Sequence, residues 1–207
     1  AAVGAMMGRR LAELAAAFTA GVKLTDNVSR ERGSNLAADL WACFPRLRIR
    51  TVFDVGANVG QTADAFSEDF RDADIYCFEP GKKAYEELKL NIERGPWYGV
   101  QAYCLAFGDA LGELNLYVPQ ETALSSLVNH VGTPEQCHVV TVDRFCASKG
   151  IERIDVLKID TEGYELRVLA GAAKMLTEGK VAVVLIETSL GDDARFVPLD
   201  VLVVASA

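Results

Sequence analysis

The residues whose types and spacing carry the clearest chemical signal lie in a glycine-bearing turn. Residues 52–55 form an apolar stretch interrupted by Asp54, and Gly56, Asn58 and Gly60 follow it before a helical stretch begins. Glycine lets a backbone approach a ligand closely, and free N–H groups at the start of a helix favour negatively charged groups. The turn therefore indicates a ligand site, although a purely structural turn after a strand has the same pattern.

A second acidic residue strengthens this interpretation. Glu79 ends the next apolar stretch, 23 residues after Gly56, and Pro80 follows it directly. An acid at the tip of the second strand of a nucleotide-binding fold can accept hydrogen bonds from both ribose hydroxyls. Glu79 alone is equally consistent with an acid at the start of a helix, but together with the glycine turn it predicts a nucleoside cofactor.

The turn also indicates which nucleoside it would take. A dinucleotide site requires glycine at the middle position of G-x-G-x-x-G, where this chain has Asn58, and the chain has no G-K-[ST] phosphate loop. Asp54 would repel a pyrophosphate, whereas its charge suits a ligand with an ammonium and a sulfonium group. The residues therefore favour S-adenosylmethionine over NAD, and an NAD-dependent oxidoreductase is the weaker hypothesis.

Alternating segments predict the elements that position these residues. Short runs rich in apolar, β-branched or aromatic residues indicate strands at 51–55, 75–78, 100–105, 154–159 and 181–186. Segments with one apolar face indicate helices at 61–70, 82–94 and 164–176. Strands that are apolar on both faces and alternate with helices predict a doubly wound α/β fold with a mainly parallel, Rossmann-like sheet.

An insertion separates the third and fourth of these strands. Residues 114–118 alternate apolar and polar side chains, and 138–142 is another β-prone run, so the two predict an inserted antiparallel hairpin. The loop 119–136 between them is long, and loops of this length are often functional. It contains His130, which is a candidate base, although a lone histidine is more often an ordinary surface residue.

The N-terminal part of the chain reads as helical. Residues 36–44 place apolar side chains on one face, and Pro45 closes the segment. We therefore expect an N-terminal helical segment at 1–48 and a ligand-binding domain at 49–207.

Composition excludes several classes of protein. The chain has 207 residues, of which 50% are hydrophobic and 24% are charged, a balance typical of an ordinary globular protein and not of a disordered chain or a coiled coil. Its net charge of −8 gives no bulk positive field for nucleic acid. Five cysteines without a C-x-x-C motif, and no apolar run of membrane-spanning length, predict a cytoplasmic protein without nucleic-acid or membrane partners.

Several motifs, in chain order, resemble those of the FkbM-type S-adenosylmethionine-dependent methyltransferases. They are Asp-Val-Gly-Ala-Asn-Val-Gly-Gln at 54–61, Phe-Glu-Pro at 78–80, Ser-Ser-Leu at 125–127, Leu-Lys-Ile-Asp-Thr-Glu-Gly-Tyr-Glu at 157–165, Val-Leu-Ala-Gly-Ala at 168–172 and Ile-Glu at 186–187. The string Asp-Thr-Glu-Gly-Tyr-Glu is the most specific, whereas many class I methyltransferases share the glycine turn. The resemblance implies a class I methyltransferase fold and O-methylation of a hydroxyl on a small molecule, polyketide or sugar.

The resemblance also implies which residues contact S-adenosylmethionine. They follow the ends of the first four strands: Asp54, Gly56, Asn58 and Gly60 for the methionine part, Glu79 and Pro80 for the ribose, Gly108 and Asp109 for the adenine, and Asp160 beside the methyl group.

Four residues are candidates for the base that takes the acceptor's proton: Asp160, Glu162, Glu187 and His130. The sequence leaves the choice open. Asp160 could instead cap the helix that starts near Gly163, and Glu162 could stabilise the first turn of that helix. No metal-ligand spacing is present, so we expect no metal.

The C-terminus departs from the family pattern. Class I methyltransferases continue past the fifth strand with a helix and an antiparallel strand pair, and the 19 residues after Thr188 are too few for these. We therefore expect a truncated strand pair, and an uncovered apolar strand edge predicts a homodimer. A non-catalytic S-adenosylmethionine-binding module or scaffold is the alternative function.

Overall fold

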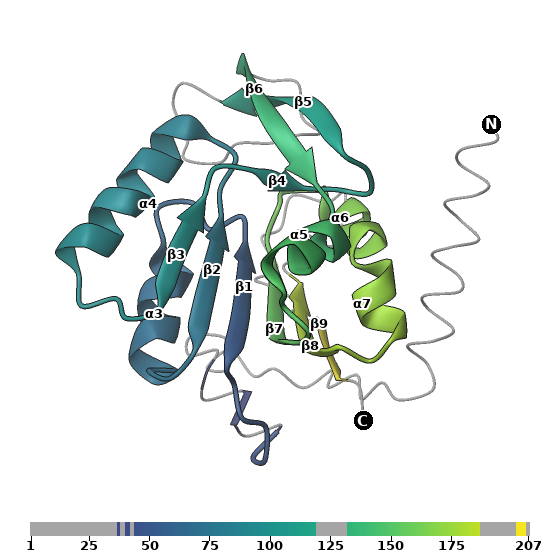
Figure 1. Ribbon diagram of the computed structural model, residues 1–207. Coiled ribbons are helices and arrows are strands. Elements are labelled where there is room, and N and C mark those ends of the chain that lie inside the picture. Colours follow the sequence, from purple (N-terminus) through teal and green to yellow (C-terminus); the bar gives the residue numbers. More distant parts are fainter. Residues whose placement is uncertain (1–36, 38–39, 42–43, 119–131, 187–201, 206–207) are drawn as a thin grey trace, which may run out of the picture.

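The central feature of the computed structural model is a six-stranded sheet, in which only the last strand is antiparallel to its neighbour (Figure 1). The structure describes residues 37, 40–41, 44–118, 132–186 and 202–205. The strand order is β3 (Val100–Tyr103), β2 (Asp74–Phe78), β1 (Thr51–Val55), β7 (Ile154–Ile159), β8 (Val181–Ile186) and β9 (Leu202–Ala205). The predicted mainly parallel α/β fold is confirmed, and β1, β7 and β8 have the predicted bounds.

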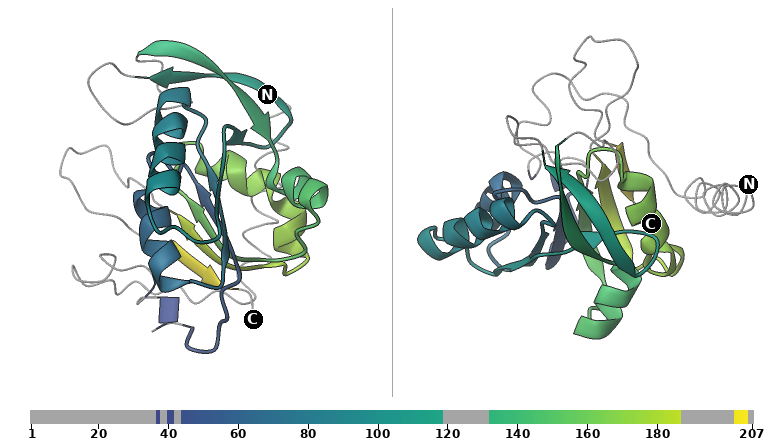
Figure 2. Two further views of the ribbon diagram at one scale, coloured as in Figure 1. Left: turned by 60° about the vertical axis from the view of Figure 1, so that its left-hand side comes forward. Right: turned by 90° about the horizontal axis from the view of Figure 1, so that it is seen from above.

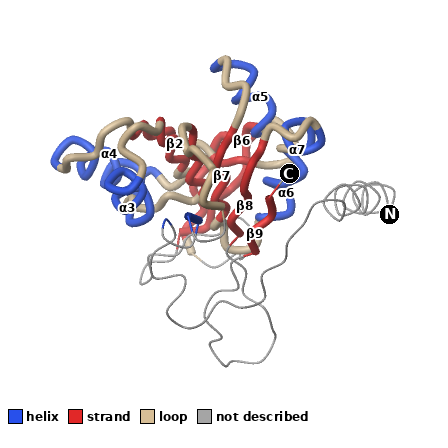
Figure 3. The backbone as a smooth tube through the Cα atoms, turned by 90° about the horizontal axis from the view of Figure 1, so that it is seen from below, coloured by secondary structure: helices blue, strands red, loops and turns tan. Residues whose placement is uncertain are grey.

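Helices cover both faces of this sheet, as a doubly wound fold requires (Figures 2 and 3). One face carries α3 (Gln61–Asp69) and α4 (Lys82–Arg94), and the other carries α5 (Val142–Lys149), α6 (Glu165–Gly171) and α7 (Ala173–Thr177). No helix in the described part of the chain combines the length and the apolar character that a membrane crossing needs.

The alternation of side chains along β1 divides the interior into two cores. Phe53 and Val55 pack with residues of α5, α6 and α7, whereas Val52 packs with Phe66 of α3 and Leu88 of α4. Successive strand residues point to opposite faces, so Asp54 shares the face of Val52. Asp54 is completely buried there.

The predicted inserted hairpin is present and forms a second sheet near the carboxyl ends of the main strands (Figure 1). Its order is β4 (Ala106–Phe107), β6 (Thr133–Val140) and β5 (Gly112–Val118), with β5 and β6 antiparallel. The strand β6 begins five residues earlier than predicted, because its first half is mostly exposed and lacks an apolar pattern. The predicted loop between the two hairpin strands therefore ends at residue 132 and not at residue 136. Residues 119–131 of this loop lie outside the described part.

The predicted helix 164–176 is interrupted between α6 and α7. The carboxylate of Asp143 accepts the backbone N–H groups of Lys174 and Met175, both at 2.9 Å. In a continuous helix these N–H groups would bind the carbonyl oxygens four residues earlier. The cap from Asp143 therefore starts a new helix at this point.

The segments on either side of the predicted alternating region contribute one strand and one helical segment. The strand β9 pairs with β8 and covers the edge that the sequence left open. The predicted homodimer, which depended on an open edge, stays a prediction. Residues 37, 40 and 41 are helical, and Ala37 and Leu40 are buried in the α3–α4 core. The expected domain boundary between residues 48 and 49 also stays a prediction.

Candidate functional site

A pocket opens where the carboxyl ends of β1, β2 and β7 face the inserted sheet. Its lining residues come from the segments that follow these strands and from β4 and β5: Val55, Gly56, Asn58, Phe78, Glu79, Pro80, Ala84, Leu105, Ala106, Phe107, Leu116, Asp160, Thr161 and Glu162. The inserted sheet supplies an apolar wall, and the main sheet supplies the acidic groups. This is the place where doubly wound α/β proteins bind ligands.

The glycine turn after β1 packs tightly against the end of β7, the helix α4 and the loop that follows α4. Gly56 has φ +82°, and a Cβ atom built on it would overlap the backbone carbonyl of Asp160. A Cβ atom on Gly60, which has φ +99°, would lie 2.7 Å from side-chain atoms of Leu88 and Trp97. The glycines thus serve close packing within the protein, a requirement separate from the predicted approach to a ligand.

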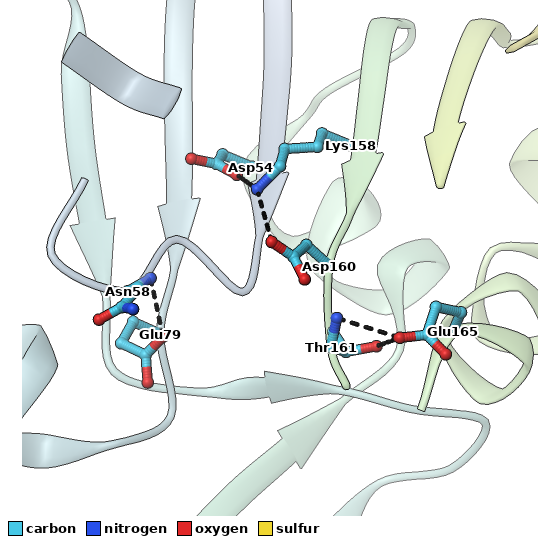
Figure 4. Close-up of polar contacts among 7 residues, drawn as sticks. All are labelled: Asp54, Asn58, Glu79, Lys158, Asp160, Thr161 and Glu165. Carbon is cyan, nitrogen blue, oxygen red and sulfur yellow. Dashed lines mark hydrogen bonds and ion pairs between the residues drawn. The ribbon is translucent and has the colours of Figure 1, made fainter. Parts of the chain in front are cut away.

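Glu79 lies at the pocket, and the backbone holds both of its carboxylate oxygens; Figure 4 shows its contact with Asn58. Its Oε2 accepts the N–H of Asn58 at 2.9 Å, and its Oε1 accepts the N–H of Gly81 at 2.8 Å. Burial raises the pKa of Glu79, although the two backbone hydrogen bonds oppose the rise. Each oxygen keeps a further lone pair, so the carboxylate can accept two more hydrogen bonds from a ligand.

A buried ammonium group joins two of the predicted site residues. Lys158 on β7 is the register partner of Asp54 on β1, and its Nζ lies 3.0 Å from Oδ1 of Asp54 and 3.4 Å from Oδ2 of Asp160 (Figure 4). Burial opposes the charge of Lys158, but the two carboxylates outweigh it and raise the pKa of the ammonium. Asp54 does not line the pocket, whereas Asp160 does.

Sequence reasoning did not select Lys158 as a site residue. The signal was a lysine between the apolar residues Leu157 and Ile159 of a predicted buried strand, where an unpaired charge would be costly. Its partner could not be found without the register of β1 against β7.

The segment after Asp160 is shaped by Glu165. One oxygen of this carboxylate accepts hydrogen bonds from the backbone N–H of Thr161 at 3.2 Å and from the Thr161 hydroxyl at 3.1 Å (Figure 4). The same oxygen accepts a hydrogen bond from the N–H of Gly163 at 2.9 Å. The resulting turn holds Glu162 at φ +53°, in the left-handed region, and Glu162 lines the pocket. Burial raises the pKa of Glu162, and the charges of Asp160 and Glu165 raise it further.

The helix cap that the sequence considered for Asp160 does not form, since α6 begins after Tyr164 without a side-chain cap hydrogen bond. The backbone N–H of Asp160 donates a hydrogen bond to the carbonyl oxygen of Val55 at 2.9 Å, which fixes the end of β7 against β1. The N–H groups before α6 bind Glu165 instead, and the carboxylate of Asp160 faces Lys158. These contacts leave Asp160 available to a ligand.

The predicted adenine contacts lie beside the pocket and do not line it. Asp109 forms an ion pair with Arg167 of α6, with both oxygens 3.2 Å from one guanidinium nitrogen. Gly108 donates its N–H to Val140, and its carbonyl oxygen leaves no room for a side chain on Gly171. Asn58, Glu79, Pro80, Asp160 and Glu162 are the predicted residues that join Gly56 at the pocket.

Two predicted base candidates, His130 and Glu187, lie outside the described residues, as does the Ser-Ser-Leu motif at 125–127. Within the described ranges, no group of three or more His, Cys, Asp or Glu side chains is arranged to hold a metal ion. The described acids at the site carry more negative charge than Lys158 compensates. The pocket therefore combines an acidic floor with an apolar wall.

Curated proteins with similar sequences are methyltransferases by name. The chain is 26% identical over 145 residues to the 2-O-methyltransferase NoeI of Sinorhizobium fredii, covering 61% of this chain and 59% of that protein. It is 26% identical over 146 residues to the hexuronic acid methyltransferase AglP of Haloferax volcanii, covering 70% of this chain and 58% of that protein. It is 27% identical over 143 residues to Methyltransferase 1 of Beauveria bassiana, covering 58% and 57%.

The matched region thus spans less than two thirds of the length of these relatives. The model of the methyltransferase FkbM domain matches residues 54–201, which include the glycine turn, Glu79 and the segment from Lys158 to Glu165. The resemblance seen in the motifs is therefore confirmed over most of the chain. This chain belongs to the FkbM methyltransferase domain family.

Proposed function

We propose that this protein transfers a methyl group from S-adenosylmethionine to a hydroxyl of a small, sugar-like acceptor. The observation that carries the proposal is the carboxylate of Glu79, held by two backbone N–H groups at the pocket of a chain that belongs to a methyltransferase family. The names of two relatives, one a 2-O-methyltransferase and one a hexuronic acid methyltransferase, support an oxygen atom of a sugar-like molecule as the acceptor.

The groups at the pocket fit this cofactor. Glu79 presents two carboxylate oxygens that can accept the two ribose hydroxyls. Phe78, Leu105 and Phe107 give an apolar surface for a flat purine ring. Asp160 and Glu162 give negative charge for a ligand that carries a sulfonium and an ammonium group.

When bound, S-adenosylmethionine supplies an activated methyl group and a neutral leaving group. The protein must then align the acceptor and remove its proton. Alignment of two reactants can contribute roughly 7–11 kcal/mol to the barrier reduction. A positioned base contributes typically about 10²–10⁴-fold in rate.

Among the described candidates, Glu162 is the base we propose. Its raised pKa makes it a stronger proton acceptor than an ordinary glutamate, and it lines the pocket. Asp160 is engaged by the ammonium group of Lys158, so its charge is already partly compensated. In the proposed step the carboxylate of Glu162 would receive the hydroxyl proton of the acceptor, and bound S-adenosylmethionine would supply the methyl group to the acceptor oxygen and leave as the neutral thioether. His130 and Glu187 stay alternative candidates from the sequence.

Calorimetry with S-adenosylhomocysteine, followed by transfer of labelled methyl groups to a panel of saccharides and other hydroxylated acceptors, tests the proposal. We expect binding and transfer that depends on the acceptor. Binding without transfer to any acceptor would favour the non-catalytic module. The absence of binding, together with binding of NADH, would favour the oxidoreductase that the sequence made the weaker hypothesis.

A further inference from the structure

We infer that Lys158 is a positioning residue of the site: it orients the carboxylate of Asp160 at the pocket while it compensates the buried charge of Asp54. The inference deepens the proposed function and rests on it, because Asp160 must meet the cofactor or the acceptor for its orientation to matter.

The geometry of the three groups gives Lys158 two different partners. The side chain of Asp54 is 0% exposed, that of Lys158 is 9% exposed, and that of Asp160 is 27% exposed. Only Asp160 of the three lines the pocket. Figure 4 shows Lys158 between Asp54 and Asp160, of which the first is fully buried and the second lines the pocket.

The ammonium group of Lys158 compensates the negative charge of the buried Asp54 carboxylate. Apart from the contact with Lys158, neither oxygen of Asp54 has a hydrogen-bond partner among the described residues, and this ion pair compensates its charge. The two residues are partners in the ladder of β1 and β7, so both backbones hold them in place. An ammonium fixed in this way can restrict a third group that it touches.

Stability alone does not account for this arrangement. A buried ion pair contributes little net stability compared with apolar side chains of the same volume, because both charges lose their hydration. A fixed ammonium beside Asp160, in contrast, engages Oδ2 and leaves Oδ1 for another partner. The three groups together carry one net negative charge, which suits a cationic ligand.

A double-variant comparison tests the inference without leaving a lone charge in the core. Asp54→Asn serves as the reference, and Asp54→Asn with Lys158→Met removes both charges of the buried pair. The carboxylate of Asp160 keeps the neighbouring ammonium group of Lys158 in the first variant and loses it in the second. We expect kcat to fall by about tenfold to 100-fold between them, the scale of a small misplacement at a reacting centre. We expect the Kd of S-adenosylmethionine not to weaken by more than about twofold, since Glu79 is intact and the lost group is a cation.

Two further measurements separate positioning from general damage. When Asp54→Asn and Asp160→Asn are both present, the same Lys158→Met change should alter kcat by less than about twofold, because the group that Lys158 orients is gone. Crystal structures of the two ligand-free variants should differ in the orientation of the Asp160 carboxylate. Arg153→Met is the matched control, since it removes a cation from another buried aspartate, Asp155 on β7, away from the pocket, and should leave kcat unchanged.

Equal losses of kcat with and without the Asp160 carboxylate, or an unchanged Asp160 in the crystal structures, would overturn the inference. So would parallel losses of kcat and affinity. If the wild-type protein binds no S-adenosylmethionine, the proposed function itself fails, and this outcome is distinguishable from failure of the role of Lys158.

Discussion

Gly56 lies directly against the backbone carbonyl of Asp160, so close that no side chain fits between the turn after β1 and the end of β7. The backbone N–H of Asp160 also donates a hydrogen bond to the carbonyl oxygen of Val55, the residue before Gly56, at 2.9 Å. This contact joins the two segments that present the pocket's turn and its acidic groups. The glycine of the family motif is therefore explained by packing within the protein.

Gly56→Ala should destabilise the protein by about 2–5 kcal/mol, because a left-handed backbone costs a residue with a Cβ atom about 1–2 kcal/mol and overpacking adds about 1–3 kcal/mol. Gly150→Ala is the control, since Gly150 has φ +67° with no atom near its Cβ position and should show only the first cost. Urea unfolding of both variants measures the difference. Equal losses in the two variants would show that the contact with Asp160 is unimportant.

Glu79→Ala should weaken binding of S-adenosylhomocysteine by about 1.5–3 kcal/mol, the usual contribution of hydrogen bonds to a charged group. Isothermal titration calorimetry measures this change. Glu113→Ala removes an exposed acid of β5 that does not line the pocket, and the affinity should then be unchanged. An unaltered affinity after Glu79→Ala would remove this residue from the site.

Glu162→Gln should lower the rate of methyl transfer by about 10²–10⁴-fold, the usual contribution of a general base, with little change in cofactor affinity. The pH dependence follows from the direction of the shift. A base works in its deprotonated form, so the rate of the wild-type protein should fall as pH decreases through the pKa of Glu162, which burial holds above the ordinary value of 4.5. Steady-state rates across pH should lack this decline in the Gln variant. A variant that keeps both its rate and the decline would assign the base elsewhere.

Asp143→Ala should reduce stability by about 0.5–2 kcal/mol, the range measured for loss of a helix cap. This carboxylate accepts hydrogen bonds from the backbone N–H groups of Lys174 and Met175 in α7. Hydrogen exchange at these amides should accelerate, while amides of β1 stay protected. Asp143→Asn retains an oxygen acceptor and should lose less. Uniform acceleration through the whole sheet would point to a global effect and not to a cap.

Local patterns in the sequence determined most of the sheet and its helices. Buried parallel strands are apolar on both faces, which is why β1, β7 and β8 could be bounded to the residue. Glu79 was found for a similar reason, because the end of a parallel strand marks the ligand edge of the fold. The split between α6 and α7 could not be read in this way, since the group that causes it lies on α5, 31 residues earlier in the chain.

Only the tertiary structure decided how the acidic residues differ from one another. The sequence alone does not distinguish the environments of the three carboxylates of Asp54, Asp160 and Glu162. The pairing of β1 with β7 places Asp54 beside Lys158 in the core. The turn held by Glu165 places Glu162 at the pocket. Strand register and the burial of each carboxylate depend on residues about a hundred positions apart. The sequence therefore determined which residues follow the strand ends at the site. The tertiary structure decided the charge partner and the burial of each carboxylate, because both depend on how the strands pair.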